Sequence, residues 1–494
     1  MVKVKAARFT LFAAAAACLS ACAVGPAFKL PASPSPGLYL PPRESSPSES
    51  HAGSGGSESA ASAYTQHLSV GANPTADWWS AFDSAELDAL VAAAVAHNET
   101  LAAAQARVAE ARELVKAQAG QLYPQVSLDG GAGRQKYGKE FLGSIINAPP
   151  FSYVAAGATV SYSLDYVGGI ARSVEERRAL AQYQRSVAEA TYLSLTGSVV
   201  TEAIEAAAAQ TELQAVARIL SEDRRNLDLV RSAYRNGSVS RVDVVTAESQ
   251  LAADETLLPP LRQRLAVAQH TLAILTGRPP AEWQSPQFSL SRLTLPRRLA
   301  LSLPASLAHR RPDILAAEAQ LHAATAAVGV ATANLYPQIT LTATGGWQSL
   351  PGEALFTRSG AAWSLISGLT APLFAGGTLR AERRASLDEL RASAAEYQEV
   401  VLESFGQVAN VLDALQHDAE FIAAQSNALK AAQSSVELAR ESYSAGNTGI
   451  LQVLDAQRQR LSAQLGVLRA QAQQYSDTTQ LFLALGGGAS QEVL

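Results

Sequence analysis

One stretch of the sequence, residues 310–342, changes from a helical to a strand pattern across a single proline. In its first part, large apolar residues recur every seven positions and an alanine follows three places later, the a/d pattern of closely packed helices. Pro337 disfavours a helical conformation at Tyr336, so we expect the helix to end there. From Ile339 onward, apolar and polar residues alternate, which is the period of a strand. The stretch predicts a helix that leads directly into a strand with one apolar and one polar face.

The same pattern occurs earlier in the chain, where Tyr123-Pro124-Gln125 matches Tyr336-Pro337-Gln338. Other marks repeat at a similar offset: Gly168-Gly169 with Gly376-Gly377, Tyr234-x-x-Gly237 with Tyr443-x-x-Gly446, and Gly277 with Gly486. The chain of 494 residues is therefore a tandem duplication, and we expect one body made of two similar halves. The offset shortens between the Tyr-Pro marks and the glycine pairs, so the first half has extra residues in the loop between its strands.

The N-terminus has the features of an export signal. Lys3, Lys5 and Arg8 precede an apolar run, residues 9–19, that is too short to cross a bilayer as a helix. Leu19-Ser20-Ala21-Cys22 resembles a lipobox, so we expect residues 1–21 to be a signal peptide and Cys22 to carry N-acyl and S-diacylglycerol chains. The alternative is an ordinary signal peptide with a chance cysteine. Ala23, rather than an aspartate, follows the cysteine and favours the outer membrane.

Composition and periodicity divide the rest of the chain. Residues 22–80 form a lipidated segment and a flexible tether, because positions 31–76 are rich in Pro, Ser, Gly and Ala and lack apolar periodicity. The first repeat spans 81–277, a Pro-rich connector 278–305, the second repeat 306–486 and a C-terminal tail 487–494. Each repeat should contain a helix, two strands, a long helix and a returning helix. We expect helices at 84–122, 170–236, 239–276 with a kink at the proline pair 259–260, 304–335, 378–445 and 449–485, and strands at 125–137, 152–167, 338–350 and 361–374.

The strands constrain the assembly. Four strands cannot close a barrel, and open edges would leave backbone groups unpaired in lipid. The chain must therefore oligomerise, and the residues alone leave open a dimer with eight strands and a trimer with twelve. The long helix 170–236 would reach about 100 Å at ~1.5 Å per residue, far more than a globular core requires.

Other function classes find little support. The seven histidines are scattered without metal-ligand spacing, and the glycine runs lack the lysine of a phosphate loop, so we expect no enzyme, no cofactor and no metal site. The formal net charge of −5 gives no indication of a nucleic-acid partner. The alternatives that remain are a lipid-tethered periplasmic coiled-coil scaffold or adaptor, and an outer-membrane conduit for type I secretion.

Several motifs ordered along the chain carry a resemblance to a known family. They are Cys22-x-Val24-Gly25-Pro26, Trp78-Trp79-x-x-Phe82, Arg310-Arg311-Pro312-Asp313-Ile314, Ala333-x-x-Tyr336-Pro337-x-Ile339, Tyr443-x-x-Gly446, Leu454-Asp455-Ala456-Gln457-Arg458 and Ala484-Leu485-Gly486-Gly487-Gly488. The chain resembles the TolC/OprM-type outer membrane factors, in the lipidated, NodT-like branch that serves resistance-nodulation-division (RND) efflux pumps.

The resemblance implies a mainly α fold with a β-barrel part. Three copies would form a homotrimer with a 12-stranded barrel in outer-membrane lipid and a long α-helical barrel in the periplasm. The helical end would meet a periplasmic adaptor (membrane fusion) protein and, through it, an inner-membrane RND pump. Such a channel passively conducts exported small molecules such as drugs, and its closed periplasmic tip is opened by adaptor binding.

The resemblance also identifies a candidate gate at the tip. Asp455 matches a gate aspartate of the family, Leu451 matches a constricting leucine, and Arg458 is close enough along the helix to pair with Asp455. Tyr443 would pair with Asp243 across to the first-half hairpin. The TolC branch has a second aspartate where this chain has Gln452 and an arginine where it has Thr448, so we expect lighter charge locking. Without the resemblance, Asp455 and Arg458 would be an ordinary exposed pair worth ~0.5 kcal/mol.

Overall fold

The computed structural model describes residues 23–30, 39, 66–136, 149–350 and 355–488. The chain forms two compact units, each built from several segments. Unit 1 contains Met1–Ala32, Arg107–Gln184 and Ala316–Tyr397, and unit 2 contains Ser33–Ala106, Arg185–Leu315 and Gln398–Leu494. The expected signal peptide, Cys22, most of the tether, parts of both strand joins and the end of the tail lie outside the described residues.

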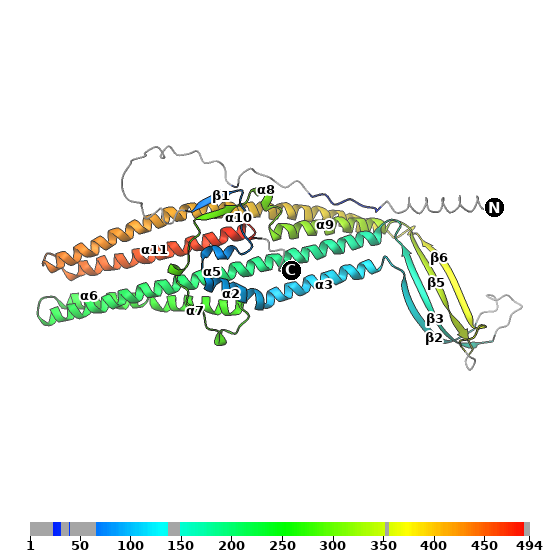
Figure 1. The fold of residues 1–494 in the computed structure, drawn as a ribbon, viewed down its shortest axis with the longest axis horizontal. Helices are drawn as coiled ribbons and strands as arrows, with labels where there is room; N and C mark the ends of the chain where they lie inside the picture. The colour runs from blue at the N-terminus through cyan, green and yellow to red at the C-terminus, as the bar shows by residue number, and fades with distance from the viewer. Residues whose placement is uncertain (1–22, 31–38, 40–65, 137–148, 351–354, 489–494) are drawn as a thin grey trace. The chain divides into compact units, whose positions relative to one another are not determined.

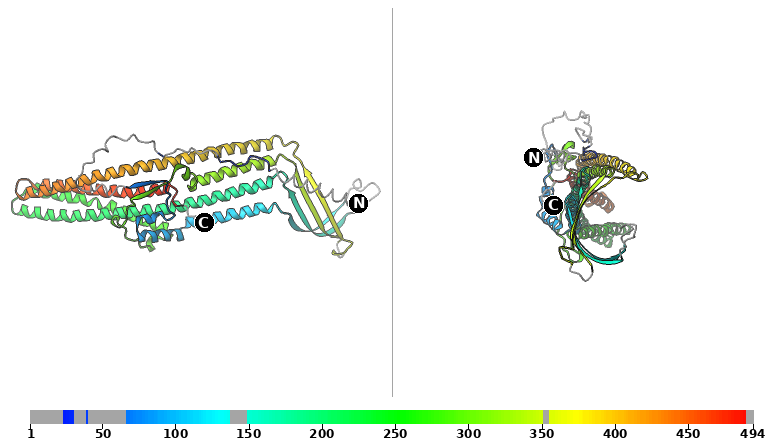
Figure 2. Two further views of the ribbon diagram at one scale, coloured as in Figure 1. Left: turned by 45° about the horizontal axis from the view of Figure 1, so that its top comes forward. Right: turned by 90° about the vertical axis from the view of Figure 1, so that its right-hand side faces the viewer.

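Unit 1 contains a four-stranded antiparallel sheet with the order β2-β3-β5-β6 (Figures 1 and 2). Its strands are β2 (Gln125–Gln135), β3 (Phe151–Leu164), β5 (Gln338–Ser349) and β6 (Ala361–Thr370). The central pair β3–β5 joins the two repeats, with a register that runs from Val154 opposite Ser349 to Leu164 opposite Ile339. The four expected strands are confirmed to within a few residues.

The helices also follow the repeat. They are α2 (Ala85–His97), α3 (Glu99–Gly120), α5 (Gly169–Arg235), α6 (Arg241–Glu255), α7 (Leu258–Leu275), α8 (Pro304–Leu307), α9 (Pro312–Ala333), α10 (Thr378–Ser444) and α11 (Ile450–Ala484). The two long helices, α5 and α10, are each 67 residues long. Among the described residues, α9 alone is long and apolar enough to cross a membrane, but 56% of its apolar window is buried inside the protein, as in a core helix.

Three helices differ from the expectation, and the one predicted at 304–335 is divided into α8, which ends at Leu307, and α9, which begins at Pro312. The single helix predicted at 84–122 is divided at Asn98, whose side-chain oxygen accepts from the Leu101 amide at 3.0 Å and whose side-chain amide donates to the Leu275 carbonyl at 3.1 Å. Asparagine favours such caps over a helix interior, which explains the break. The kink expected at residues 259–260 is a break between α6 and α7, with both prolines in the first turn of α7, where a missing amide hydrogen costs nothing.

The last part of the tether is more ordered than predicted. There, β1 (His67–Val70) pairs in parallel with β4 (Arg298–Leu301) of the connector in unit 2. Short 3-10 turns, η3 (Pro280–Glu282) and η4 (Leu290–Arg292), precede β4, and η2 (Trp78–Phe82) follows β1. The expectation of a tether without order as far as residue 76 was therefore wrong for this part, because a four-residue strand leaves too short a pattern to recognise.

Two pairs of neighbouring carboxyl groups, each with at least one buried member, lie on the helices of unit 2. Asp223 of α5 and Asp254 of α6 are 5% and 7% exposed, and Gln250 donates to Asp254 Oδ2 at 2.7 Å. Burial, followed by the nearby Asp254 carboxyl and Glu222, raises the pKa of Asp223 to about 7, and Arg460 offsets only part of this. In the second pair, burial and the neighbouring Asp477 raise the pKa of Asp418 to about 7.

We expect the Asp223 pair to make unit 2 less stable as pH rises. An unfolded aspartate ionises near ~3.9, so between about pH 4 and 7 the unfolded chain releases a proton that the folded chain retains, and stability falls across this window. Asp223→Asn removes the titration, and its melting temperature relative to the unmodified protein should therefore be more favourable at pH 8 than at pH 5. Asp228→Asn, at an exposed position of the same helix, is the control and should show no such trend. A constant difference for Asp223→Asn would contradict the assignment.

Two adjacent glycines of β5 allow a matched test of sheet packing. A Cβ at Gly346 would lie 2.5 Å from the Ala156 carbonyl oxygen and 2.6 Å from Gly157 Cα, whereas nothing lies within 4 Å of one at Gly345. Gly346→Ala should therefore separate β3 from β5 and destabilise the sheet by ~1–3 kcal/mol, while Gly345→Ala should be tolerated. Thermal unfolding of both variants in detergent measures the difference, and equal melting temperatures would show that the sheet can relax around the added methyl group.

Candidate functional site

The four-stranded sheet has one apolar and one polar face. On β3 the apolar face carries Val154, Ala156, Ala158, Val160, Tyr162 and Leu164, and the opposite face carries Ala155, Gly157, Thr159, Ser161 and Ser163. Paired residues of antiparallel strands share a face, so the register extends this division across the sheet. On the apolar side, Leu128, Trp363, Leu365 and Leu369 are each at least 70% exposed. A face of this kind, open to the surroundings, suits contact with lipid.

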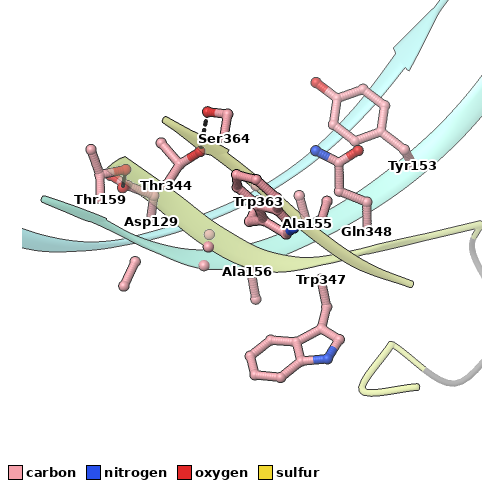
Figure 3. Close-up of a pocket in the computed structure, with 17 residues that line it drawn as sticks. Asp129, Tyr153, Ala155, Ala156, Thr159, Thr344, Trp347, Gln348, Trp363 and Ser364 are labelled. Carbon is pink, nitrogen blue, oxygen red and sulfur yellow. Dashed lines mark hydrogen bonds between the residues drawn. The ribbon is translucent and has the colours of Figure 1, made fainter. Parts of the chain in front are cut away.

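The polar face carries a row of hydrogen-bonded side chains (Figure 3). Thr159 Oγ1 donates to Asp129 Oδ2 at 2.7 Å, and Ser127 Oγ donates to the same oxygen at 3.2 Å. Further along the row, the Thr344 and Ser364 hydroxyls are 2.7 Å apart. Asp129 was not among the predicted site residues, although it is the one acidic residue of the strand predicted at 125–137 and could have drawn attention for that reason.

Both outer strands of the sheet have an open edge. Within the described residues, β2 pairs only with β3, and β6 pairs only with β5. The outer backbone N–H and C=O groups of these two strands therefore require partners from elsewhere when the sheet lies in lipid.

The residues that follow Cys22 lie at the end of β3 in unit 1. The Val24 amide donates to the Val167 carbonyl at 3.0 Å, and Arg172 Nε donates to the Val24 carbonyl at 3.1 Å. Phe28 stacks on His322 with ring centroids 4.3 Å apart. This segment is thereby fixed where β3 ends and α5 begins.

A cluster of charged and polar side chains, Arg172, Glu175 and His322, contacts the segment that follows Cys22. Glu175 contacts Arg172 Nη1 at 2.7 Å and His322 Nε2 at 3.0 Å. Burial opposes ionisation of Glu175, but hydrogen bonds from His322 and Arg172 outweigh it and lower the pKa of the Glu175 carboxyl. The ionised carboxylate therefore holds together the two side chains that contact Val24 and Phe28.

In unit 2, α5 and α6 form one helical hairpin, and α10 and α11 form another. The turn of each hairpin lies at its end. Gly237 and Gly446 have φ of 74° and 73°, a conformation that ends a helix easily only at glycine. Apolar residues of the two hairpins form one core: Leu227, Val230, Ala247, Val436, Ala439, Ile450, Val453, Leu454 and Ala456, with Val239, Val244, Leu251 and Tyr443 packed against it. The hairpin ends of the two repeats are thus packed together.

Three of the five predicted gate residues form one stripe at the start of α11. Leu451 is 43% exposed, and Arg458 Nη2 donates to Asp455 Oδ1 at 2.8 Å, so the predicted ion pair is confirmed. Gln459 Nε2 donates to the other oxygen, Asp455 Oδ2, at 2.8 Å. The stripe lies opposite the buried side chains of Ile450, Val453 and Leu454, so the helix presents it away from the core.

The other two predicted gate residues have local contacts in this chain. Asp243 accepts hydrogen bonds from the Ser240 amide and hydroxyl, both at 2.8 Å, in a capping box that starts α6. Tyr443 packs against the core of the hairpin ends. Within the described residues, the structure therefore does not bring Tyr443 and Asp243 together as a hydrogen-bonded pair.

A set of polar contacts between α5, α10 and α11 was not predicted. Asn226 donates to Gln457 Oε1 at 2.7 Å, and Glu222 contacts Arg460 at 2.5 Å and Arg440 at 3.6 Å. These bonds link α5 to α10 and α11 across the two repeats. Gln457 belongs to the Leu454–Arg458 motif, but nothing in the sequence distinguishes its charged neighbours Glu222 and Arg460, because charged residues occur throughout the heptads of all four helices.

The Arg310–Ile314 motif has a packing role. Arg311, whose side chain is 8% exposed, forms bonds with Asp313 at 2.6 Å, Gln407 at 2.8 Å and the Ala484 carbonyl at 2.8 Å. The guanidinium thereby caps the C-terminal end of α11, where carbonyl oxygens lack helical partners. The motif connects the start of α9 to α10 and α11.

Comparison with known proteins agrees with this architecture. The family model described as outer membrane efflux protein matches residues 90–278 and 303–487. The pyoverdine export outer membrane protein OpmQ of Pseudomonas aeruginosa is 32% identical over 440 residues, which cover 87% of this chain and 91% of that protein. Nodulation protein T of Rhizobium leguminosarum bv. trifolii is 26% identical over 415 residues, covering 83% and 87%.

Solved structures show the same fold. The outer-membrane channel OprN superposes with a TM-score of 0.81 at 26% identity and covers 94% of this chain and 99% of its own. CusC, whose structure is described with transmembrane channel formation, has a TM-score of 0.78 at 24% identity and covers 94% and 100%. This is a family of efflux channels and not an enzyme family. The chain belongs to the outer membrane efflux protein family and is the outer-membrane channel component of an efflux system.

Proposed function

We propose that three copies of this chain close a 12-stranded barrel in the outer membrane. The observation that supports this proposal is the pair of open edges on β2 and β6, because lipid offers no hydrogen bonds to the backbone of an unpaired strand. β6 of one copy would pair with β2 of the next, and three such contacts close a ring with the polar face inside and the apolar face toward lipid.

Helices α5 and α10 with their returning partners would continue the barrel as a periplasmic tunnel. A straight helix of 67 residues is about 100 Å long, which is enough to reach far into the periplasm. At the far end the hairpins would meet a periplasmic adaptor and, through it, an inner-membrane RND pump. The cargo would be small molecules; relatives are named for pyoverdine export and for toluene efflux.

Lipidation of Cys22 would anchor the N-terminus. Its support is the position of the next residues: Val24 bonds Val167, at the end of β3 where a membrane surface would lie. Acyl chains on Cys22 could therefore enter the inner leaflet without a long tether.

The gate would lie at the exposed stripe Leu451, Asp455 and Arg458. These side chains point away from the core of the hairpin ends, so threefold symmetry could bring them together around the axis. Three copies of Asp455 near an axis repel unless partners balance them, and Arg458 provides that balance at 2.8 Å.

The lipid anchor is tested by metabolic labelling with palmitate. Cys22→Ser should abolish labelling and leave the protein in the outer-membrane fraction, because the strands hold it there independently. Cys18→Ser, inside the expected signal peptide, is the matched control and should still be labelled. Continued labelling of Cys22→Ser would contradict the lipobox assignment.

The channel and its gate are tested in planar bilayers with purified protein. Asp455→Ala combined with Arg458→Ala should raise single-channel conductance and, in cells, admit large antibiotics such as vancomycin. An exposed pair is worth ~0.5 kcal/mol and contributes to closure only through contacts that exist in the closed tip alone, so three pairs give at most about 1.5 kcal/mol, or roughly a tenfold shift toward the open tip.

The matched control is an equivalent pair elsewhere. Asp388 and Arg391 of α10 are also exposed, also three residues apart and 2.7 Å from each other. Asp388→Ala with Arg391→Ala should leave conductance unchanged. If the Asp455 double variant conducts like the unmodified trimer, these residues do not lock the gate; if the unmodified protein forms no trimeric channel, the proposed assembly is wrong.

A further inference from the structure

The polar face of the sheet carries a single charged side chain. Across the described strands β2, β3, β5 and β6, Asp129 is the only Asp, Glu, Lys, Arg or His on that face. Arg134, the other charged residue of β2, has the opposite parity and belongs to the apolar face near the end of the strand. The remaining side chains of the polar face are small, hydroxyl, amide, aromatic or aliphatic groups. Asp129 therefore sets the sign of the fixed charge on this face.

The position of Asp129 is held by its neighbours. Thr159 and Ser127 both donate to Oδ2, at 2.7 and 3.2 Å, and among the described residues no hydrogen bond is formed to Oδ1. The charge is thus fixed on the wall by two hydroxyl groups that donate to one of its oxygens. No cation of the described strands neutralises it.

The surface beside Asp129 is hollow. A cavity of ≈ 510 Å³ lies over the sheet, with Asp129, Thr159, Thr344 and Ser364 near one end and Tyr153 and Gln348 at the other (Figure 3). Small residues lie between these ends: Gly131, Ala155, Gly157, Gly346 and Ala362. In Figure 3, Ala155 and Gln348 point to one side of the sheet and Ala156 and Trp347 to the other. The residues next to Asp129 have small side chains, so they do not shield its carboxylate on the polar face of the sheet.

We propose that Asp129 gives the barrel a preference for cations over anions. This inference rests on the proposed trimer, in which three Asp129 carboxylates form a ring around the lumen. Rings of acidic side chains favour cations in channels, and a low-dielectric wall concentrates their field. A lumen potential of about one kT changes the ratio of cations to anions by e squared, or roughly sevenfold.

The test is the reversal potential of single channels under a KCl gradient at low salt. The unmodified channel should prefer K⁺, Asp129→Asn should reduce the K⁺/Cl⁻ permeability ratio several-fold, and Asp129→Lys should turn the preference toward Cl⁻. Asp129→Glu is the conservative variant and should retain the preference. The effect should disappear near 1 M salt, where the screening length is about 3 Å, compared with about 30 Å at 0.01 M.

A cysteine variant isolates the barrel from the tip. Asp129→Cys should react with charged methanethiosulfonate reagents added from the outer side, a negative adduct restoring the K⁺ preference and a positive adduct reversing it. Leu128→Cys, on the opposite face, should not react, and the unmodified protein controls for Cys18 and Cys22.

The outcomes separate the two proposals. Conducting Asp129→Asn trimers with an unchanged reversal potential would overturn the role of Asp129 and leave the channel intact. Reaction at Leu128→Cys but not at Asp129→Cys would overturn the assignment of the faces. Absence of channels from the unmodified protein would overturn the proposed assembly and this inference with it.

Discussion

The need of every backbone amide and carbonyl for a partner governs this protein. Inside one chain, the hydrogen-bond ladder extends over four strands and stops at β2 and β6. In water those edges could be solvated, but in lipid each unpaired group costs several kcal/mol. A sheet with one lipid-compatible face therefore has no stable state as a single chain in a membrane. Closure with other copies follows from this constraint, and an enclosed polar lumen follows from closure.

The helices are held together in a different way. Two of them are 67 residues long, and the chain has few aromatic residues to pack between them. Small and branched aliphatic side chains pack closely together, as in the core of alanine, valine, leucine and isoleucine shared by the hairpin ends of both repeats. Polar links add to this packing: Glu222 joins α5 to α10 and α11 across the two repeats, and Arg311 ties α9 to α10 and α11 within the second repeat. The buried pair Asp223 and Asp254 has the opposite effect, since burial of two carboxyls lowers stability near neutral pH.

Much of the fold could be predicted because its local chemistry is consistent. Tyr123-Pro124 and Tyr336-Pro337 end helices by sterics alone, and the alternation after them leaves one strand register that turns the large apolar side chains toward lipid. The β1–β4 pair could not be predicted, since its strands are short and over two hundred residues apart. Asn98 was missed because helical periodicity continues on both sides of it. At the tip, the Asp455–Arg458 pair follows from helix spacing, whereas Asp243 was assigned across the hairpins although its own capping box was nearer.

The equal length of α5 and α10 has a rotational consequence. Each has 67 residues, although the loops between the strands of the two repeats differ in length. An α-helix turns by about 100° per residue, so one inserted residue would lengthen a helix by only ~1.5 Å but would swing everything beyond it by more than a quarter of a turn. The hairpin ends would then present a different face to the helices packed against them. The residue count of these helices therefore sets an angle as well as a distance, and the angle is the stricter requirement.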